Sequence, residues 1–237
     1  MNYDSLKSDR DDMVRDGAAF EAYRRPGDLI DSQHPKITAY ARRVAADGSD
    51  REKALRLYYA VRDDLRYDPY NTPMKREAYR ASATLAAGHG YCVNKAGLMA
   101  AVCRAVGIPA RVGYADVRNH MTSPKLYERV RTDVFIWHSY AELLVAGKWV
   151  KATPAFDAAL CARVGIAALE FDGQTDSLFQ PFDRTGRRHM EYLKDRGAFA
   201  DVPFETMVAE FQATYPMLFS EKGISGDFRA EAVAAAD

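Results

Sequence analysis

The stretch GHGYCVNKA, residues 88–96, decides how the fold of this chain is interpreted. Apolar residues follow it at helical spacing as far as Gly107 and Pro109, which predicts a helix beginning at or just before Cys92. The first turn of a helix presents unpaired backbone N–H groups and a partial positive charge, which stabilise a thiolate. We therefore interpret Cys92 as an activated thiol nucleophile with a pKa below the usual value of about 8.5.

Helices are also predicted on the N-terminal side of this stretch. Ser49 and Glu52 match a capping box and precede apolar residues at helical spacing, which predicts a helix over 50–65. Another helix is expected over about 35–46. A short helix is expected over 82–87, capped by the serine with which it begins. The chain is therefore helical up to the end of the Cys92 helix.

Strand patterns follow on the C-terminal side. Residues 110–114 and 134–145 are rich in β-branched and aromatic residues, and 149–152 return as a partner strand after a turn at 146–148. A further hairpin is expected to join 179–182 to 189–192, and a final amphipathic helix over about 203–219 is expected to pack on the sheet.

Helices followed by antiparallel strands are typical of an α+β fold, here with the nucleophile helix packed on the sheet. We expect an N-terminal helical extension over 1–34 and a catalytic core over 35–160. The remaining residues, 161–237, are expected to complete the same domain with a hairpin and a helix. Loops at 66–80, 115–133 and 172–186 are expected to form the walls of the cleft.

The overall composition limits the classes of partner. The chain has 237 residues, with 33 basic residues balanced by 33 acidic ones, so nothing favours binding to nucleic acid or to an anionic membrane. The first twelve residues are polar, and no stretch approaches the roughly 18 apolar residues of a membrane span. Three cysteines are too few for a disulfide scaffold, so we expect a cytoplasmic protein with reduced thiols.

His138 is the candidate partner of Cys92, because it lies on a predicted strand that the fold can bring against the nucleophile helix. An imidazole can take the thiol proton and later return it to a leaving amine. The turn at 146–148 sets His138 opposite residue 155 or 157, with Thr153 on the same face. Asp157 carries the charge needed to stabilise an imidazolium, although Pro154 interrupts the ladder.

These segments resemble the transglutaminase-like superfamily of papain-type cysteine enzymes. Residues 90–96 resemble its nucleophile motif, 107–112 the segment after the helix, and 138–150 the histidine hairpin. The resemblance covers residues 35 to 157. The family commonly has an aspartate where this chain has Thr153, so the resemblance leaves either Asp157 or the Thr153 hydroxyl to orient the histidine.

The resemblance implies acyl transfer through a Cys92, His138 and Asp157 triad. The cysteine would attack an amide carbonyl of a peptide or protein, and a thioester would pass to water or to an amine, with water the expected acceptor. The oxyanion would be held partly by the Cys92 backbone N–H. No cofactor or metal is expected, and the oligomeric state is left open.

Four alternatives remain. The acceptor could be an amine, as in protein cross-linking, or the chain could resemble an arylamine acetyltransferase, which uses a similar triad. The altered aspartate position could instead indicate a degenerate member kept as a binding module. His89 and Cys92 form a weak zinc pattern without a second ligand pair. Cys103 and Cys161 are interpreted as buried structural residues.

Overall fold

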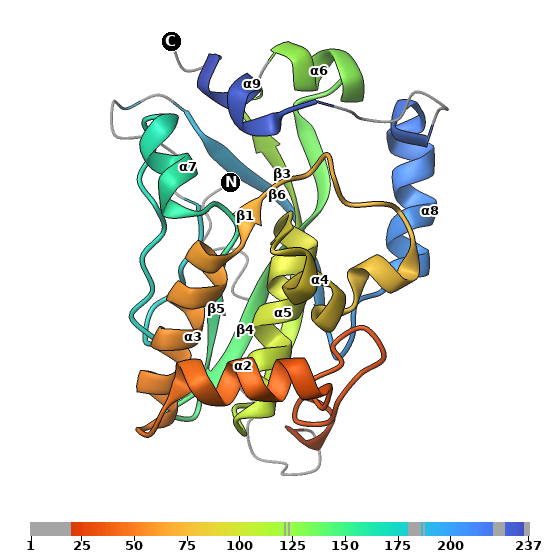
Figure 1. The fold of residues 1–237 in the computed structure, drawn as a ribbon. Coiled ribbons are helices and arrows are strands. Elements are labelled where there is room, and N and C mark those ends of the chain that lie inside the picture. Colours follow the sequence, from red (N-terminus) through yellow and green to blue (C-terminus); the bar gives the residue numbers. More distant parts are fainter. Residues whose placement is uncertain are drawn as a thin grey trace.

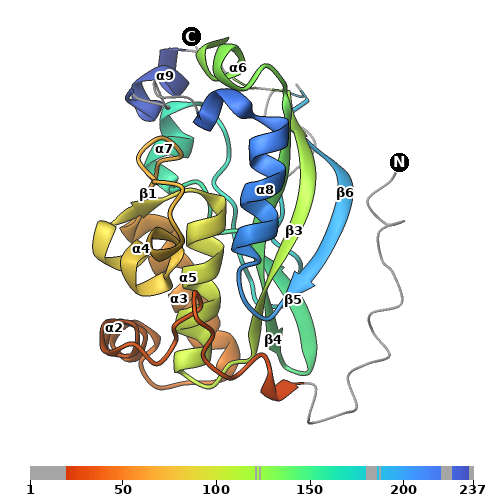
Figure 2. The same ribbon diagram turned by 90° about the vertical axis from the view of Figure 1, so that its right-hand side faces the viewer.

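Helices from the first part of the chain lie against one face of a four-stranded sheet formed by the second part (Figure 1). The structure is a computed structural model, and it describes residues 20–120, 122, 124–179, 186, 188–219 and 226–234. Seen along the sheet, the layer of helices and the layer of strands are distinct (Figure 2). The expected α+β fold with its antiparallel sheet is confirmed.

After a helical segment that ends at Glu21, four further helices and two short strands precede the main sheet within the described residues. The helices are α2 (Pro35–Ala45), α3 (Asp50–Asp64), α4 (Ala81–Ala87) and α5 (Cys92–Ala105), with a 3-10 turn η3 (Arg76–Tyr79) before α4. Strands β1 (Arg66–Tyr67) and β2 (His89–Gly90) pair in parallel. This small pairing ties the end of α3 to the residues just before Cys92.

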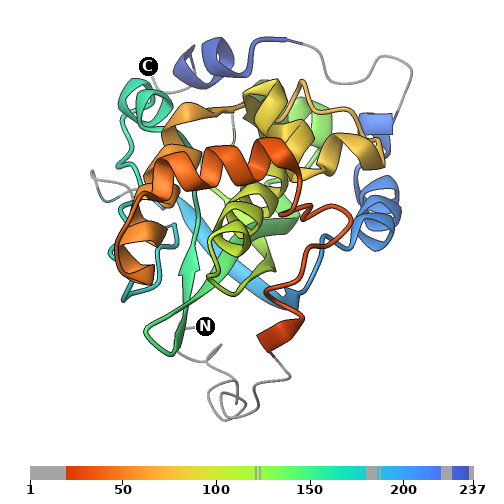
Figure 3. The ribbon, with the colours of Figure 1, turned by 60° about the horizontal axis from the view of Figure 1, so that its bottom comes forward.

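The central helix is α5, whose residues from Cys92 to Arg104 are all buried. It packs on the sheet on one side, and α2, α3 and α4 cover it on the others (Figure 3). A helix that is apolar or small on every side requires such complete enclosure. The Cys92 end of α5 is therefore fixed from several directions.

The main sheet has the strand order β5-β4-β3-β6. Its strands are β3 (Ala110–Asn119), β4 (Val134–Val145), β5 (Lys148–Ala152) and β6 (Met190–Phe199). In the β4–β5 hairpin, Leu143 pairs with Val150 and Ala141 with Ala152, which is the register predicted from the turn. The chain leaves the sheet after Ala152, before it reaches the level of His138.

The remaining elements surround one end of this sheet. They are α6 (Pro124–Val130), α7 (Ala158–Arg163), α8 (Phe204–Thr214), η4 (Pro216–Phe219) and α9 (Phe228–Ala234). Helices α6 and α9 lie side by side, joined by Arg129 and Glu231 (Figure 1). In the part of the chain that the structure describes, we find no helix with the length and apolar character needed to cross a membrane.

Several predicted elements are confirmed. The helix predicted over 50–65 is α3, and both bonds of its capping box are present: Glu52 N–H donates to the Ser49 hydroxyl and Ser49 N–H to the Glu52 carboxylate. The helices expected at 35–46 and after Cys92 also form. The final helix ends at Thr214, and a 3-10 turn follows from Pro216.

Other expectations are corrected. Residues 115–133 are not a loop, because β3 continues to Asn119 and α6 follows. Ser82 does not cap α4: it lies inside the helix, and the carboxylate of Asp31 accepts its backbone N–H at 3.0 Å and also its hydroxyl. A carboxylate from a distant loop thus replaces the local cap.

Some expectations remain untested. The hairpin expected between 179–182 and 189–192 falls partly on residues outside the described ones, as does most of the extension 1–34. On its described side, the chain enters β6, which pairs with β3. The division of the chain at residues 34 and 160 stays a prediction.

Lys95 joins the first turn of α5 to the end of α3. Its fully buried ammonium group donates to the carbonyl oxygens of Arg62 at 2.9 Å and Leu65 at 2.7 Å. Burial lowers the pKa of Lys95 from 10.5 to about 7, although the carboxylates of Asp157 and Asp63 act in the opposite direction. A buried lysine therefore fixes the position of the Cys92 turn.

We expect Lys95→Met to change how stability depends on pH. Between pH 7 and 9 the unfolded chain keeps the Lys95 proton while the folded chain releases it, so Lys95 makes the free energy of unfolding rise with pH, by up to about 1.4 kcal/mol per pH unit. Urea unfolding across this window should show a smaller rise in the variant. Lys36→Met, at an exposed position, should keep the wild-type slope. Equal slopes in all three proteins would contradict a lowered Lys95 pKa.

Candidate active site

Cys92 is the first residue of α5, as the sequence predicts, and the preceding loop is held tightly. Gly88 ends α4 in the left-handed conformation, with φ of 68°. A Cβ atom at Gly90 would lie 2.7 Å from the Cβ of Asn94, so glycine is needed where the chain passes the first turn of α5. Backbone bonds from Asp68 to Gly90 and from Arg66 to Gly88 fix the same loop.

The sulfur of Cys92 is buried, with 8% of the residue exposed, and this reverses the expected direction of its pKa shift. Burial raises the pKa of the thiol to about 11. The backbone N–H groups of Ser139, Val93 and Cys92 itself lower this pKa in part. Loss of water thus outweighs the helix start, and the Cys92 thiol is neutral at physiological pH.

The Ser139 N–H group that faces this sulfur belongs to β4, so the sulfur lies against the strand that carries His138. His138 pairs with Ala115 of β3, just beyond an irregularity in the ladder. Ile136 and Trp137 together oppose Asp116 there, which is the arrangement of a β-bulge. Bulges bend a strand and redirect the side chains beside it.

Trp137 sits in the left-handed region at φ of 58°, a strained conformation for a large residue. Its backbone N–H donates to Asp116 at 3.1 Å and its indole N–H donates to Glu210 at 3.1 Å. Arg196 lies over the indole ring at 4.6 Å and pairs with both carboxylates. Three side chains from β3, β6 and α8 therefore hold the bulge that precedes His138.

The imidazole of His138 is enclosed by aromatic rings. The ring centroids of Phe179 and Tyr192 lie 5.6 Å and 6.4 Å from its own. Burial lowers the pKa of His138 to about 4, so the ring is neutral at physiological pH. Its Nε2 atom is buried, and no hydrogen-bond partner for it occurs in the described part of the chain.

Cys92 and His138 line the same cavity, which has a volume of about 510 Å³. The loop at 67–74 forms one wall, as the sequence predicts for 66–80, and α6 forms another within 115–133. Phe211, Leu218 and Phe228 add walls from the C-terminal part. A volume in this range suits a small organic molecule. The structure thus brings together two of the three predicted site residues.

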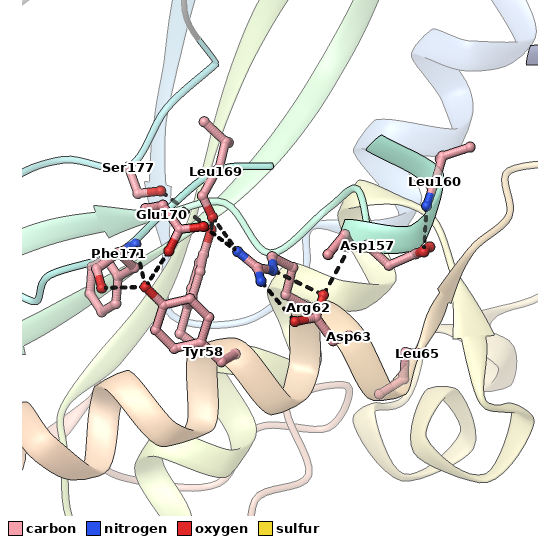
Figure 4. A network of polar contacts seen from close by, with 12 residues as sticks. Tyr58, Arg62, Asp63, Leu65, Asp157, Leu160, Leu169, Glu170, Phe171 and Ser177 are labelled. Carbon is pink, nitrogen blue, oxygen red and sulfur yellow. Dashed lines mark hydrogen bonds and ion pairs between the residues drawn. The ribbon is translucent and has the colours of Figure 1, made fainter. Parts of the chain in front are cut away.

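Asp157 is placed differently from the other two. It caps α7, where Oδ1 accepts the Leu160 N–H at 2.9 Å and pairs with Arg229, while Oδ2 accepts the Tyr67 N–H at 3.0 Å. Desolvation raises its pKa, but these donors outweigh it and hold the pKa below the usual value. Figure 4 shows Asp157 beside the Arg62 and Asp63 network at the end of α3.

Thr153 also lies near this part of the fold and is buried. Its carbonyl oxygen accepts the Tyr58 hydroxyl at 3.2 Å. Its own hydroxyl is buried without a hydrogen-bond partner in the described residues. The structure therefore shows neither an Asp157 nor a Thr153 bond to His138 among those residues, and the orienting role of either stays a prediction.

Some features of the site could not be found from the sequence. The bulge at Trp137, the Asp116, Arg196 and Glu210 group that holds it, and the Ser139 N–H all depend on strand pairing between distant segments. Cys103 and Cys161 are buried free thiols, and no group of three metal-ligating side chains is found within the described ranges.

Comparison with known families identifies the core. The model of the transglutaminase-like superfamily matches residues 38–154. Over this segment the chain belongs to the transglutaminase-like superfamily. The transglutaminase-like core therefore contains Cys92, His138 and Thr153, whereas Asp157 lies just beyond the matched segment.

Two solved structures are similar to this transglutaminase-like chain. One, from Cytophaga hutchinsonii, is called a "putative cysteine protease": it is 21% identical, with a TM-score of 0.44, over 60% of this chain and 44% of that one. The other, from Parabacteroides distasonis ATCC 8503, is called a "putative protease": it is 21% identical, with a TM-score of 0.39, over 57% of this chain and 25% of that one. The matched part is thus less than half of either protein. No curated protein matches this chain.

Proposed function

We propose that this protein transfers acyl groups from amide bonds, with Cys92 as nucleophile, His138 as base and water as the acceptor. The observation that carries the proposal is that Cys92 and His138 line one cavity, with the Ser139 N–H facing the sulfur. Membership of a superfamily of cysteine enzymes supports the same chemistry. The substrate is proposed to be a peptide or protein amide, and the unpaired thiols fit the cytoplasmic location expected from the sequence.

The first step starts from the neutral thiol of Cys92 and the neutral imidazole of His138. His138 takes the proton of Cys92 as the sulfur attacks the carbonyl carbon, so a C–S bond forms and the carbonyl electrons move to oxygen. Backbone N–H groups near the sulfur, including that of Cys92, are suited to hold this oxyanion. The C–N bond then breaks, and the imidazolium returns its proton to the leaving amine.

The second half of the reaction releases the acyl group. Water attacks the thioester carbonyl and gives a proton to His138, and collapse of the intermediate expels the sulfur, which takes that proton back. The products are a carboxylic acid and the free thiol. An amine in place of water would give a new amide by the same steps.

Asp157 is proposed as a supporting residue of this site. An orienting contact with His138 remains the prediction from the sequence, whereas the bonds present in the structure support a positioning role through the Tyr67 backbone. Tyr67 pairs with Gly90, two residues before Cys92. Asp157→Asn should therefore lower activity while leaving the acid limb of the pH profile in place. A shifted acid limb would favour direct orientation of His138.

A second candidate is a binding module that does not turn over its ligand. One observation favours it: the Cys92 thiol has a raised pKa, and neither Asp157 nor Thr153 bonds to His138 within the described residues. Such a domain would use the same cavity to hold a ligand. The enzyme and the binding module therefore differ in whether a covalent acyl group forms on Cys92.

The test is to trap that acyl group. The protein is mixed with p-nitrophenyl butyrate, quenched in acid within milliseconds to seconds, digested and analysed by mass spectrometry. We expect a burst of nitrophenol and a butyryl thioester on the peptide that contains Cys92, released later as free acid. A protein that binds the ester without acylation of Cys92 would instead be the binding module.

A further inference from the structure

The described walls of the cavity beside Cys92 carry no formally charged side chain. Among the described residues that line it there is no Asp, Glu, Lys or Arg, although such residues make up 28% of the chain. Aromatic and aliphatic side chains dominate instead, contributed by the 67–74 loop, α6, β4 and the C-terminal helices. A substrate group inside it would thus meet apolar surface on several sides.

Three of the four lining tyrosines, Tyr70, Tyr91 and Tyr215, do not change this conclusion, because their hydroxyls already have protein partners. The Tyr70 hydroxyl donates to Glu231 at 2.8 Å, and the Tyr91 hydroxyl lies 2.9 Å from that of Tyr79. Tyr215 donates to the Val134 carbonyl at 2.9 Å and accepts the Ile136 N–H at 2.7 Å. These residues therefore offer ring surface rather than free hydroxyls to a ligand.

The cavity extends away from the reacting atoms along the sheet. Its walls include Phe135, three residues before His138 on β4, and the paired residue Val117 on β3. Three residues at the usual rise of a strand place Phe135 roughly 10 Å from His138 along β4. Leu126 and Val130 line the cavity from α6, which connects the end of β3 at Asn119 to the start of β4 at Val134. The site thus has space for a group much longer than an acetyl unit.

Building on the proposed function, we propose that the acyl group accepted by Cys92 is uncharged and apolar, either aliphatic or aromatic. A carboxylate or ammonium in this cavity would lose its hydration without gaining an ionic partner from the described walls. An apolar chain gains by leaving water, and each buried methylene improves binding by about fourfold. The preference therefore concerns the acyl side of the substrate and leaves the amine side open.

The preference can be measured with p-nitrophenyl acetate, butyrate, octanoate and hemisuccinate. We expect kcat/KM to rise by about fourfold per methylene until the cavity is full. The anionic hemisuccinate should be slower than the butyrate, which has the same number of acyl carbons, by more than about tenfold. A flat series, or equal rates for these two esters, would overturn the proposal.

Leu126→Trp adds a spatial test at the α6 wall of the cavity. The larger side chain should reduce kcat/KM for the octanoate by about tenfold or more, and for the acetate by a much smaller factor, because the acetyl group does not extend to α6. Tyr127→Trp is the matched control, because Tyr127 lies on the same helix but is 49% exposed and does not line the cavity. An equal loss of kcat/KM for both esters in Leu126→Trp would show that this part of the cavity does not discriminate between acyl groups by their length.

A failure of the proposed acyl transfer can be distinguished from a failure of the proposed preference for apolar acyl groups. If no ester acylates Cys92, the proposed function is wrong, and the cavity is then tested by calorimetric titration of octanamide and succinamate into Cys92→Ala. Saturable binding of octanamide alone would support the apolar preference in a binding module. Binding of neither compound, or of both equally, would overturn it.

Discussion

Cys92→Ala is expected to reduce kcat/KM for a cleavable amide or ester by about 10,000-fold or more. The sulfur forms the covalent bond in the proposed mechanism, and removal of a nucleophile leaves only binding and polarisation of the carbonyl. The change replaces a buried thiol by a smaller apolar group at a helix start, so the fold should be retained. Single-turnover acylation and steady-state hydrolysis should both be measured.

Cys103→Ala is the control for this experiment. Cys103 lies on the same helix and is fully buried, but it does not line the cavity. Its replacement should change kcat/KM by less than about fivefold, because it lowers stability rather than removing a reacting atom. Comparable rates for wild type and Cys92→Ala would exclude nucleophilic catalysis at Cys92.

His138→Ala is expected to reduce kcat/KM by about 100- to 10,000-fold and to change the shape of the pH profile. In the wild type, His138 with its pKa of about 4 is unprotonated above that pH, and the thiol remains protonated up to about pH 11. The wild-type rate should therefore be nearly constant from pH 5 to 9 and fall below pH 5. Without the base, the rate should follow the thiolate and rise about tenfold per pH unit.

The control here is His120→Gln, because His120 pairs with Glu191 at the surface and does not line the cavity. Its profile should match that of the wild type. A wild-type rate that instead rises with pH as in His138→Ala would show that His138 does not accept the thiol proton.

The lowered pKa of His138 also affects the stability of the fold. Between pH 4 and 6.5 the unfolded chain binds a proton at His138 that the folded chain does not, so the His138 contribution to stability is lost as pH falls through this window. Acid unfolding of His138→Ala should consequently be less steep over this range. The pH profile of the rate and the acid unfolding of His138→Ala therefore test the lowered pKa of His138 in two independent ways.

Local features of the fold were predictable from the sequence. The Ser49 and Glu52 capping box, the start of α5 at Cys92 and the β4–β5 register all appear as expected. Each depends on hydrogen bonds and side-chain periodicity within a few residues or across a short turn. Cys92 and His138 were predicted as candidates because their flanking motifs are equally local.

The partners of Asp157 and the conformation of Trp137 could not be found this way. After Ala152 the chain leaves the sheet, so counting along the hairpin no longer gives the position of Asp157. Arg229 and the Tyr67 N–H reach its carboxylate from segments far away in the sequence. The bulge at Trp137 likewise depends on its pairing with β3.

The sequence by itself determined the helices α2 to α5, the β4–β5 hairpin and the two candidate groups, Cys92 and His138, that line the cavity. Only the tertiary structure decided the ionisation of those groups, because burial is set by elements that are distant in the chain. Desolvation raises the Cys92 pKa despite its place at a helix start, and it lowers that of His138. The apolar cavity has the same origin, since the 67–74 loop, α6, β4 and the C-terminal helices form it only when packed together.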